Sequence, residues 1–275
     1  MLYERSDVPS EKMVILGHTM WKRGDAEAAE VVGLIKEFAQ LPKHIRWLYP
    51  TAMSVLESTN DYRTISDISE KLLTIEPEHP AARFYLGWSL YRLGKLERAE
   101  SVFSESIEKN LELKRCHYFK GKVLTALYKS AEAVHEFDKA ASHGNDELRL
   151  WESRIEAKFL SSWFQSARHD IEFLQEAGHS DKKFVRFWHA LLKIQAIEYE
   201  QAIADFEDRS LIEHDPGLAA YYICVALIKV GRFEDAARLN EDMVADAWRP
   251  MVRILSHLER GREVTGELIE RYQQS

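Results

Sequence analysis

The stretch LGWSLYRLGKLERAESVF, residues 86–103, decides the fold of this chain. Two small residues, Gly87 and Ala99, stand among large apolar side chains on either side of Gly94. Glycine takes the backbone conformation that a tight turn requires, and small residues let two helices approach closely. The stretch therefore predicts two helices joined by a short turn at Gly94, with Phe103 on the second helix packing against the first.

The second half of this hairpin recurs along the chain. Its first position returns at steps of 34 or 35 residues, at Tyr62, Leu96, Ser130, Phe164, Tyr199 and Phe233. Three residues after each of these comes a mostly small residue, at Ile65, Ala99, Ala133, Ala167, Ala202 and Ala236. Gly24 and Ala29 repeat the pattern once more near the start. Each copy ends in an amphipathic helix with a period of 3.6 residues, so the chain contains seven copies of one helical unit.

A 34-residue period with alanine in the second helix resembles the tetratricopeptide repeat, whose unit is two antiparallel helices. The best copy covers residues 80–111, and Pro77 ends the copy before it. The resemblance implies an all-α fold, a right-handed α-solenoid of about seven helix-turn-helix repeats that form a single domain over residues 1–275. The expected repeats lie near residues 10–45, 46–79, 80–113, 114–147, 148–182, 183–216 and 217–246. Because stacked repeats need polar-faced ends, residues 247–275 are expected to form a capping helix pair or, as an equal alternative, an eighth repeat.

Two copies depart from the pattern of the family. Arg154 and Lys158 stand where apolar residues are expected in the fifth copy. In the sixth copy the apolar face is shifted by one position, to Phe187, Ala190, Leu191 and Ile194.

Composition limits the classes of function. The chain has 37 Lys and Arg against 45 Asp and Glu, and its formal net charge of −8 disfavours general binding to nucleic acid or anionic membranes. No apolar run is long enough to cross a bilayer, and the start has no signal-peptide core. With two cysteines, Cys116 and Cys224, expected to be separate buried thiols, the sequence predicts a cytoplasmic protein.

Motifs for chemistry are missing from the sequence. It has no HExxH and no CxxC, and Gly121-Lys122 is followed by Val123 rather than by the Ser or Thr of a phosphate loop. The nearest approach to a metal or acid–base cluster is His135, Glu136 and Asp138, which is interpreted as a solvated helix face, as is the pair His169 and Asp170. No catalytic residue, metal site or cofactor is predicted, and the chain is not expected to be an enzyme.

The resemblance also implies where a partner would bind. In tetratricopeptide proteins the first helix of each repeat lines a concave groove that holds peptides. Transferred to this sequence, the groove would carry Trp47, Phe84, Trp88, Tyr91, Arg92, Arg115, Tyr118, Lys122 and Arg149, with Glu152 and Glu156 beyond them. Aromatic and arginine side chains dominate binding hot spots, so the expected occupant is a protein or peptide with acidic and apolar residues. Packing within the fold and ion pairs to neighbouring carboxylates are the alternative roles of these residues.

These features favour a non-catalytic scaffold or adaptor that binds a segment of a partner protein. Two alternatives stay open: a dedicated chaperone for a secreted or assembling client, and the recruiting subunit of a separate enzyme. Self-association through a last helix bearing Val264, Leu268 and Tyr272 is a further alternative.

Overall fold

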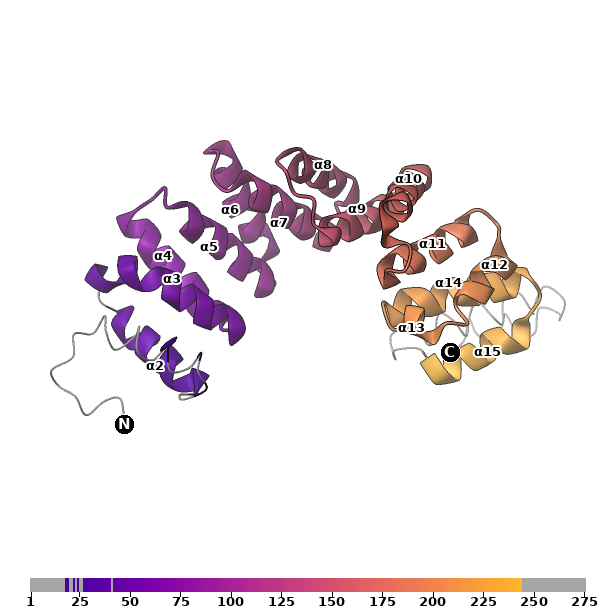
Figure 1. Cartoon of the computed structure of the whole chain (residues 1–275), viewed down its shortest axis with the longest axis horizontal. Helices are drawn as coiled ribbons and strands as arrows, with labels where there is room; N and C mark the ends of the chain where they lie inside the picture. The colour runs from indigo at the N-terminus through magenta and orange to yellow at the C-terminus, as the bar shows by residue number, and fades with distance from the viewer. Residues whose placement is uncertain (1–17, 20–21, 23, 25–26, 41, 244–275) are drawn as a thin grey trace, which may run out of the picture. The chain divides into compact units, whose positions relative to one another are not determined.

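The computed structural model describes residues 18, 19, 22, 24, 27–40 and 42–243, which contain helices and no β-strand. They fall into two compact units, residues 1–150 and 151–275. The first unit holds α2 (Ala28–Phe38), α3 (Pro42–Ser58), α4 (Tyr62–Ile75), α5 (Pro80–Arg92), α6 (Leu96–Glu108), α7 (Leu113–Ala126) and α8 (Ser130–Ser142). Within it, successive helices pack against each other in chain order (Figure 1).

The second unit begins within α9 (Leu148–Leu160). It continues with α10 (Phe164–Leu174), a π-helical turn (Gln175–His179), α11 (Lys183–Gln195), α12 (Tyr199–Asp205), α13 (Arg209–Ile212), α14 (Pro216–Lys229) and α15 (Phe233–Met243). The predicted all-α solenoid of paired helices is therefore confirmed. The proposed cap, residues 247–275, and most of residues 10–26 at the start of the first repeat lie outside the described residues, and the repeat boundaries stay predictions. Within the described ranges no helix is long and apolar enough to span a membrane.

Local sequence signals begin the first helix of several repeats. Pro80 and Pro216 are the first residues of α5 and α14. Proline suits this place because its missing N–H would have no partner inside the helix. The carboxylate of Asp215 then accepts a hydrogen bond from the backbone N–H of Leu218 at 3.0 Å. Asp215 thus caps α14, and Pro216 and Gly217 are its first two residues.

The turn between the two helices of each repeat has the same backbone conformation every time. A residue with positive φ stands two positions before the second helix, at Asn60 (55°), Gly94 (72°), Tyr128 (60°), Ser162 (59°), Ile197 (68°) and Gly231 (78°). Neighbouring members of this series are one repeat apart, as the sequence period requires. The expectation that Asn60 and Gly94 hold the turn conformation is confirmed, while Tyr128 and Ile197 occupy it against their intrinsic preference.

Replacing Ile197 with asparagine is expected to stabilise the chain by about 1 kcal/mol. A left-handed residue other than glycine costs roughly 1–2 kcal/mol, and asparagine tolerates this conformation better than a β-branched side chain does. Ile197 is 72% exposed, so its replacement removes little packing. Chemical unfolding measures the change, and Gly94→Ala, at the equivalent turn, is the control that should destabilise. A lower stability of Ile197→Asn than of the wild type would contradict the argument.

In two repeats, a glycine on the first helix leaves space for a phenylalanine ring of the second helix. A Cβ atom on Gly87 would lie 2.7 Å from the ring of Phe103, and one on Gly121 would lie 2.5 Å from the ring of Phe137. Both phenylalanines are fully buried. The two pairs occupy the same positions in successive repeats, so the close approach predicted from Gly87 is a repeated feature of the fold. Cys116 and Cys224 are both buried and neither is in a disulfide, which confirms the prediction of separate thiols.

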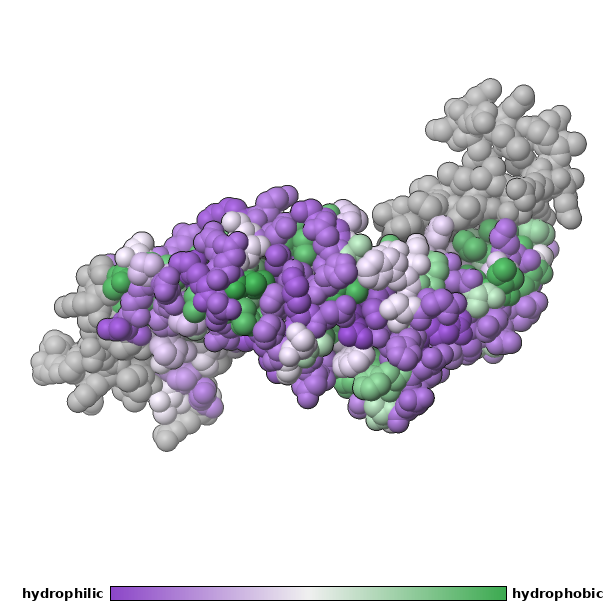
Figure 2. Space-filling model, turned by 90° about the horizontal axis from the view of Figure 1, so that it is seen from above, coloured by the Kyte–Doolittle hydropathy of each residue, from purple (hydrophilic) through white to green (hydrophobic). Residues whose placement is uncertain are grey.

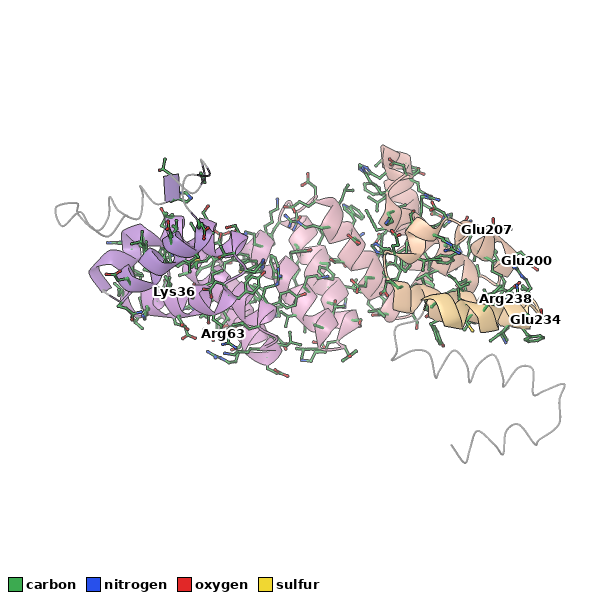
Figure 3. The ribbon with its side chains drawn as sticks, turned by 90° about the horizontal axis from the view of Figure 1, so that it is seen from below. Lys36, Arg63, Glu200, Glu207, Glu234 and Arg238 are labelled. Atoms are coloured by element: carbon green, nitrogen blue, oxygen red, sulfur yellow. The ribbon has the colours of Figure 1, made fainter. Side chains whose placement is uncertain are left out.

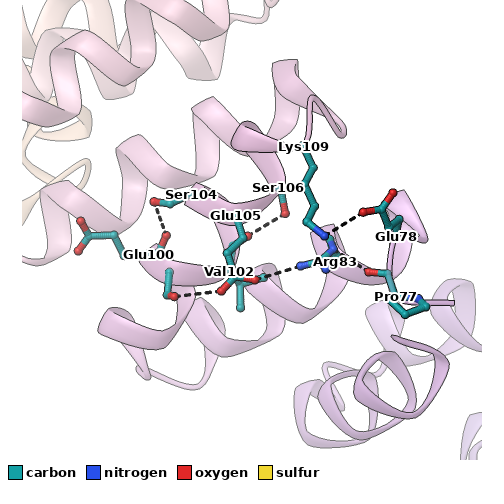
Figure 4. Close-up of polar contacts among 10 residues, drawn as sticks. Pro77, Glu78, Arg83, Glu100, Val102, Ser104, Glu105, Ser106 and Lys109 are labelled. Carbon is teal, nitrogen blue, oxygen red and sulfur yellow. Dashed lines mark hydrogen bonds and ion pairs between the residues drawn. The ribbon is translucent and has the colours of Figure 1, made fainter. Parts of the chain in front are cut away.

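Polar contacts link the connection before α5 to the hairpin of α5 and α6. Arg83 at the start of α5 donates to the backbone carbonyl of Pro77 at 2.9 Å and pairs with Glu105 on α6 at 3.1 Å (Figure 4). Lys109 reaches Glu78 in the preceding connection at 2.9 Å. These contacts hold the connection before α5 against the end of α6.

Exposed charges cover the outer surfaces. Figure 2 shows a mainly hydrophilic face with small, separate hydrophobic areas. Figure 3 shows Arg63 on α4 and Glu234 on α15 pointing away from their helices, and Arg238 pairs with Glu234 one turn earlier at 3.8 Å. Exposed pairs of this kind contribute about 1 kcal/mol or less to stability.

The fifth repeat contains a buried ion triad. Asp170 on α10 is 2% exposed, and its carboxylate accepts from Arg154 at 2.5 and 2.9 Å and from Lys158 at 2.6 Å. Arg154 and Lys158 are the two residues that break the apolar pattern of this copy. The interpretation of Asp170 as part of a solvated face is therefore wrong, because this carboxylate neutralises two cations inside the helix pair; His169 beside it is exposed.

Candidate functional site

The first unit contains a pocket of about 380 Å³ along its first helices. We call it the first-helix pocket. Its lining comes from α3, α5, α7 and the segment that leads into α9, and consists of Glu57, Phe84, Trp88, Lys114, Arg115, Tyr118, Phe119, Asn145, Glu147 and Arg149. Four consecutive first helices thus contribute to one site, and its volume is within the range of about 300–1,000 Å³ that is usual for ligand pockets.

The repeat explains why these residue types gather here. Phe84 and Tyr118 occupy the same position of successive repeats, and so do Arg115 and Arg149. A solenoid places equivalent positions side by side. The pocket therefore combines a row of aromatic rings with a row of arginines.

Five of the predicted groove residues line this pocket: Phe84, Trp88, Arg115, Tyr118 and Arg149. Phe84 is only 1% exposed, since the guanidinium of Arg115 lies 3.5 Å from the centre of its ring. Phe84 therefore forms the floor of the pocket and supports Arg115, and a direct contact of its ring with a partner stays a prediction.

The remaining predicted residues are not among the pocket's lining. Arg92 lies over the ring of Tyr62 at 4.4 Å and Tyr91 packs edge-on against Phe119. Lys122 is half-buried one turn beyond Tyr118 on α7. The side chain of Trp47 lies outside the described residues. In the second unit, Glu152 pairs with His214 at 3.3 Å.

Sequence reasoning missed five lining residues: Glu57, Lys114, Phe119, Asn145 and Glu147. A signal existed for Glu57, because it lies one repeat before Tyr91 and so shares a position that was considered. Asn145 was hidden because it belongs to a connection rather than to a first helix. There its side-chain oxygen accepts a hydrogen bond from the backbone N–H of Glu147 at 3.3 Å.

Cations in the pocket differ in how far they are already neutralised. Arg149 forms an ion pair with Glu147. Arg115 has the Glu112 carboxylate 3.8 Å away and is half exposed. Lys114 forms no ion pair with any residue in the described ranges. Lys114 and Arg115 are therefore the groups best placed to receive an anion.

Tyr85 lies beside the pocket. Its burial, and to a smaller extent a hydrogen bond to the Glu57 carboxylate, raises its pKa.

A second cluster of titratable groups lies between α7 and α8. Nδ1 of His117 is 2.6 Å from the Glu136 carboxylate, and both side chains are buried. Burial lowers the pKa of His117, and the neighbouring carboxylate opposes this shift. Burial would raise the pKa of Glu136, but His117, Lys120 and Lys139 together lower it.

The position of Glu136 corrects one prediction. His135 and Asp138 are exposed as expected, but Glu136 is only 7% exposed and belongs to this buried pair. Glu136 was expected in water because its neighbour Phe137 takes the buried position on this helix. It is buried as well, because His117 on α7 provides a partner that the sequence spacing does not show. Among the described residues no group of three or more His, Cys, Asp or Glu side chains could hold a metal ion.

Comparisons with known proteins agree with this architecture. Residues 58–140, which include α4 to α7 and most of α8, match the family model of anaphase-promoting complex, cyclosome, subunit 3. A search of curated proteins finds no match to this sequence.

Solved structures are similar in fold. YrrB, described as a TPR protein with an unusual peptide-binding site, is 18% identical over 70% of this chain and 97% of its own, with a TM-score of 0.50. A tetratricopeptide repeat protein from Parabacteroides merdae is 18% identical over 82% of this chain and 87% of its own, with a TM-score of 0.56. A chain of the APC/C Cut9–Hcn1 hetero-tetramer is 12% identical over 87% of this chain and 47% of its own, with a TM-score of 0.54.

At these identities the solved structures support the fold alone. Together with the sequence repeat, the recurrent left-handed turn and the family match, they establish the kind of unit from which the chain is built. The chain has the fold of tetratricopeptide-repeat proteins.

Proposed function

We propose that this chain is a non-catalytic scaffold that holds a segment of a partner protein in the first-helix pocket. The observation that carries the proposal is the pocket itself, in which four successive first helices present aromatic walls beside cations. Trp88 is half-buried and offers the indole that most often anchors a protein contact. Repeat proteins commonly bind extended segments along such surfaces.

Charge defines the occupant of the pocket. Its lining includes three cations, Lys114, Arg115 and Arg149, and two carboxylates, Glu57 and Glu147. Glu147 already pairs with Arg149, and Arg115 has only the long 3.8 Å contact with Glu112, so Lys114 and Arg115 are the cations that would receive a carboxylate of the partner. Trp88, Tyr118 and Phe119 supply the apolar wall. The partner segment therefore carries an acidic residue close to an aromatic or aliphatic one.

A second candidate function is that of a structural subunit in a larger assembly. The match of residues 58–140 to a subunit of the anaphase-promoting complex favours it, because that protein is by name part of a multiprotein complex. The two functions share the same surface, since α5 and most of the pocket lie within the matched segment. Neither Cys116 nor Cys224 is in a disulfide, which favours a reducing compartment such as the cytoplasm as the place of action.

Selection from a random peptide library on the full chain, followed by titration of the selected peptides, tests the scaffold function. The double variant Trp88→Ala with Arg115→Glu is expected to bind at least a hundredfold more weakly, because each hot-spot residue contributes about 2 kcal/mol or more. Lys114→Glu alone should weaken binding about tenfold with unchanged helical content, because in the described structure Lys114 forms no ion pair that the fold would lose.

The matched control is Arg98→Glu with Phe173→Ala, which changes an exposed arginine on α6 and an exposed aromatic ring on α10. Neither residue lines the first-helix pocket, so the control should bind as the wild type does. Full affinity in the Trp88 and Arg115 double variant would refute the proposed site.

A further inference from the structure

The second unit has a pocket of its own at the turn end of its helices. It measures about 430 Å³, and we call it the edge pocket. One wall is the start of α10 and the other is the end of α11, through Ser162, Trp163, Phe164, Gln165, Ser166, Arg168, Leu192, Gln195 and Ala196. The residues of the proposed scaffold site all lie outside it.

Three exposed apolar side chains belong to the lining of this pocket or lie next to it in the sequence. Trp163 in the lining is 38% exposed, Leu160 two residues before the lining is 49% exposed, and Ile197 directly after Ala196 is 72% exposed. The described residues have six exposed large hydrophobic side chains, and these three are half of them. Apolar side chains that gather around a pocket indicate an interaction surface, whereas single exposed ones are ordinary.

Backbone strain accompanies this exposure. Ile197 has φ of 68°, a left-handed conformation that a β-branched residue rarely adopts. Its side chain is neither buried nor suited to its backbone, so the fold gains nothing from isoleucine at this turn. The turn conformation is common to all repeats, so what is particular here is a large apolar side chain held in water next in sequence to the lining residue Ala196.

Electrostatics indicate what the pocket accepts. Arg168 is the only charged residue in its lining, and it forms no ion pair with any side chain in the described ranges. No side chain caps the N-terminus of α10, whose first residues Phe164 and Gln165 line the same pocket. Backbone N–H groups at a helix start and a neighbouring guanidinium both favour a negative group.

We propose that the edge pocket is a second docking site, specific for a protein segment with an apolar side chain next to an Asp or Glu carboxylate. The apolar side chain inserts between Trp163 and Leu192, in contact with Ile197 at the rim. The carboxylate pairs with Arg168. This site is independent of the first-helix pocket, because it uses other repeats and shares no residue with it.

A library experiment on a chain whose first-helix pocket is disabled isolates the second site. Random peptides are selected on the full-length variant Trp88→Ala with Lys114→Glu and are then titrated against further variants on the same background. The expected peptides have an apolar residue within three positions of an Asp or Glu. Trp163→Ala and Arg168→Glu should each weaken their binding by about tenfold or more.

Ile197→Asn separates binding from folding, because it is expected to stabilise the chain and yet to weaken binding severalfold. Phe173→Ala is the matched control, since Phe173 is 49% exposed on α10, outside the pocket, and should leave binding unchanged. Selection of no peptide that depends on Trp163 and Arg168 would overturn the proposal, as would selected peptides without a carboxylate. Neither outcome would contradict the proposed function of the first-helix pocket, because the Trp88→Ala, Lys114→Glu variant lacks binding at that pocket.

Discussion

Replacing Asp170 with alanine is expected to lower the free energy of unfolding of the second unit by about 3–5 kcal/mol. The carboxylate is 2% exposed and accepts hydrogen bonds from both Arg154 and Lys158. Removing one member of a buried ion cluster leaves the other charges without a partner in a medium of low dielectric, which is where losses of this size arise. Chemical denaturation followed by circular dichroism measures the change.

Two further variants separate the missing charge from lost packing. Asp205→Ala removes the partner of Lys193, a side chain at 17% exposure, and should cost clearly less than Asp170→Ala. The triple variant Arg154→Leu, Lys158→Met, Asp170→Leu should recover most of the lost stability, because apolar residues of similar volume replace buried ions at little cost. If the triple variant were as unstable as Asp170→Ala, the ion triad would not be the cause.

Phe137→Ala is expected to cost about 3–5 kcal/mol, as is usual for the truncation of a buried phenylalanine. Its ring fills the space over Gly121, where an added Cβ would lie 2.5 Å from it. Gly121→Ala alone should therefore cost about 1–3 kcal/mol through overpacking. In the double variant Gly121→Ala, Phe137→Leu the two changes should offset each other in part. A loss equal to the sum of the losses in Gly121→Ala and in Phe137→Leu alone would contradict the contact.

Gly33→Ala is the control for this pair. Gly33 lies within α2, and a Cβ added there meets no atom within 4 Å. Alanine favours a helix over glycine by about 1 kcal/mol, so this substitution should stabilise. If alanine raises the free energy of unfolding at Gly33 and lowers it at Gly121, the loss at Gly121 comes from the phenylalanine and not from helix propensity.

The repeat could be predicted from sequence because the fold uses the same positions in every copy. Gly87, Ala99 and Phe103 indicate one hairpin, and their recurrence indicates the solenoid. The repeat pattern did not predict the structure of the fifth copy. It showed that Arg154 and Lys158 replace apolar residues, but it did not show what they contact. Their partner, Asp170, lies on the other helix of the pair and looks solvated by spacing alone. Periodicity reports which face is buried, and it does not show that a buried face is charged.

The first-helix pocket could be predicted in part for the same reason. Trp88, Arg115, Tyr118 and Arg149 occupy first-helix positions, and the solenoid brings them together. The burial of Phe84 could not be predicted from its own repeat, because the arginine that covers it comes from the next one. Asn145 and Glu147 belong to a connection whose path the helical period does not determine. The edge pocket gave no sequence signal, since it depends on turn residues that the repeat pattern treats as spacers.

Site-specific photo-crosslinking tests most directly whether the first-helix pocket holds the partner segment. A photoreactive phenylalanine analogue replaces Lys114 in one protein and Arg98 on the outer face in another, and each is irradiated with a peptide selected on the wild-type chain. We predict a crosslink from position 114, mapped by mass spectrometry to the apolar and acidic part of the peptide, and none from position 98. Equal crosslinking from both positions, or crosslinking only from position 98, would contradict the proposed scaffold site.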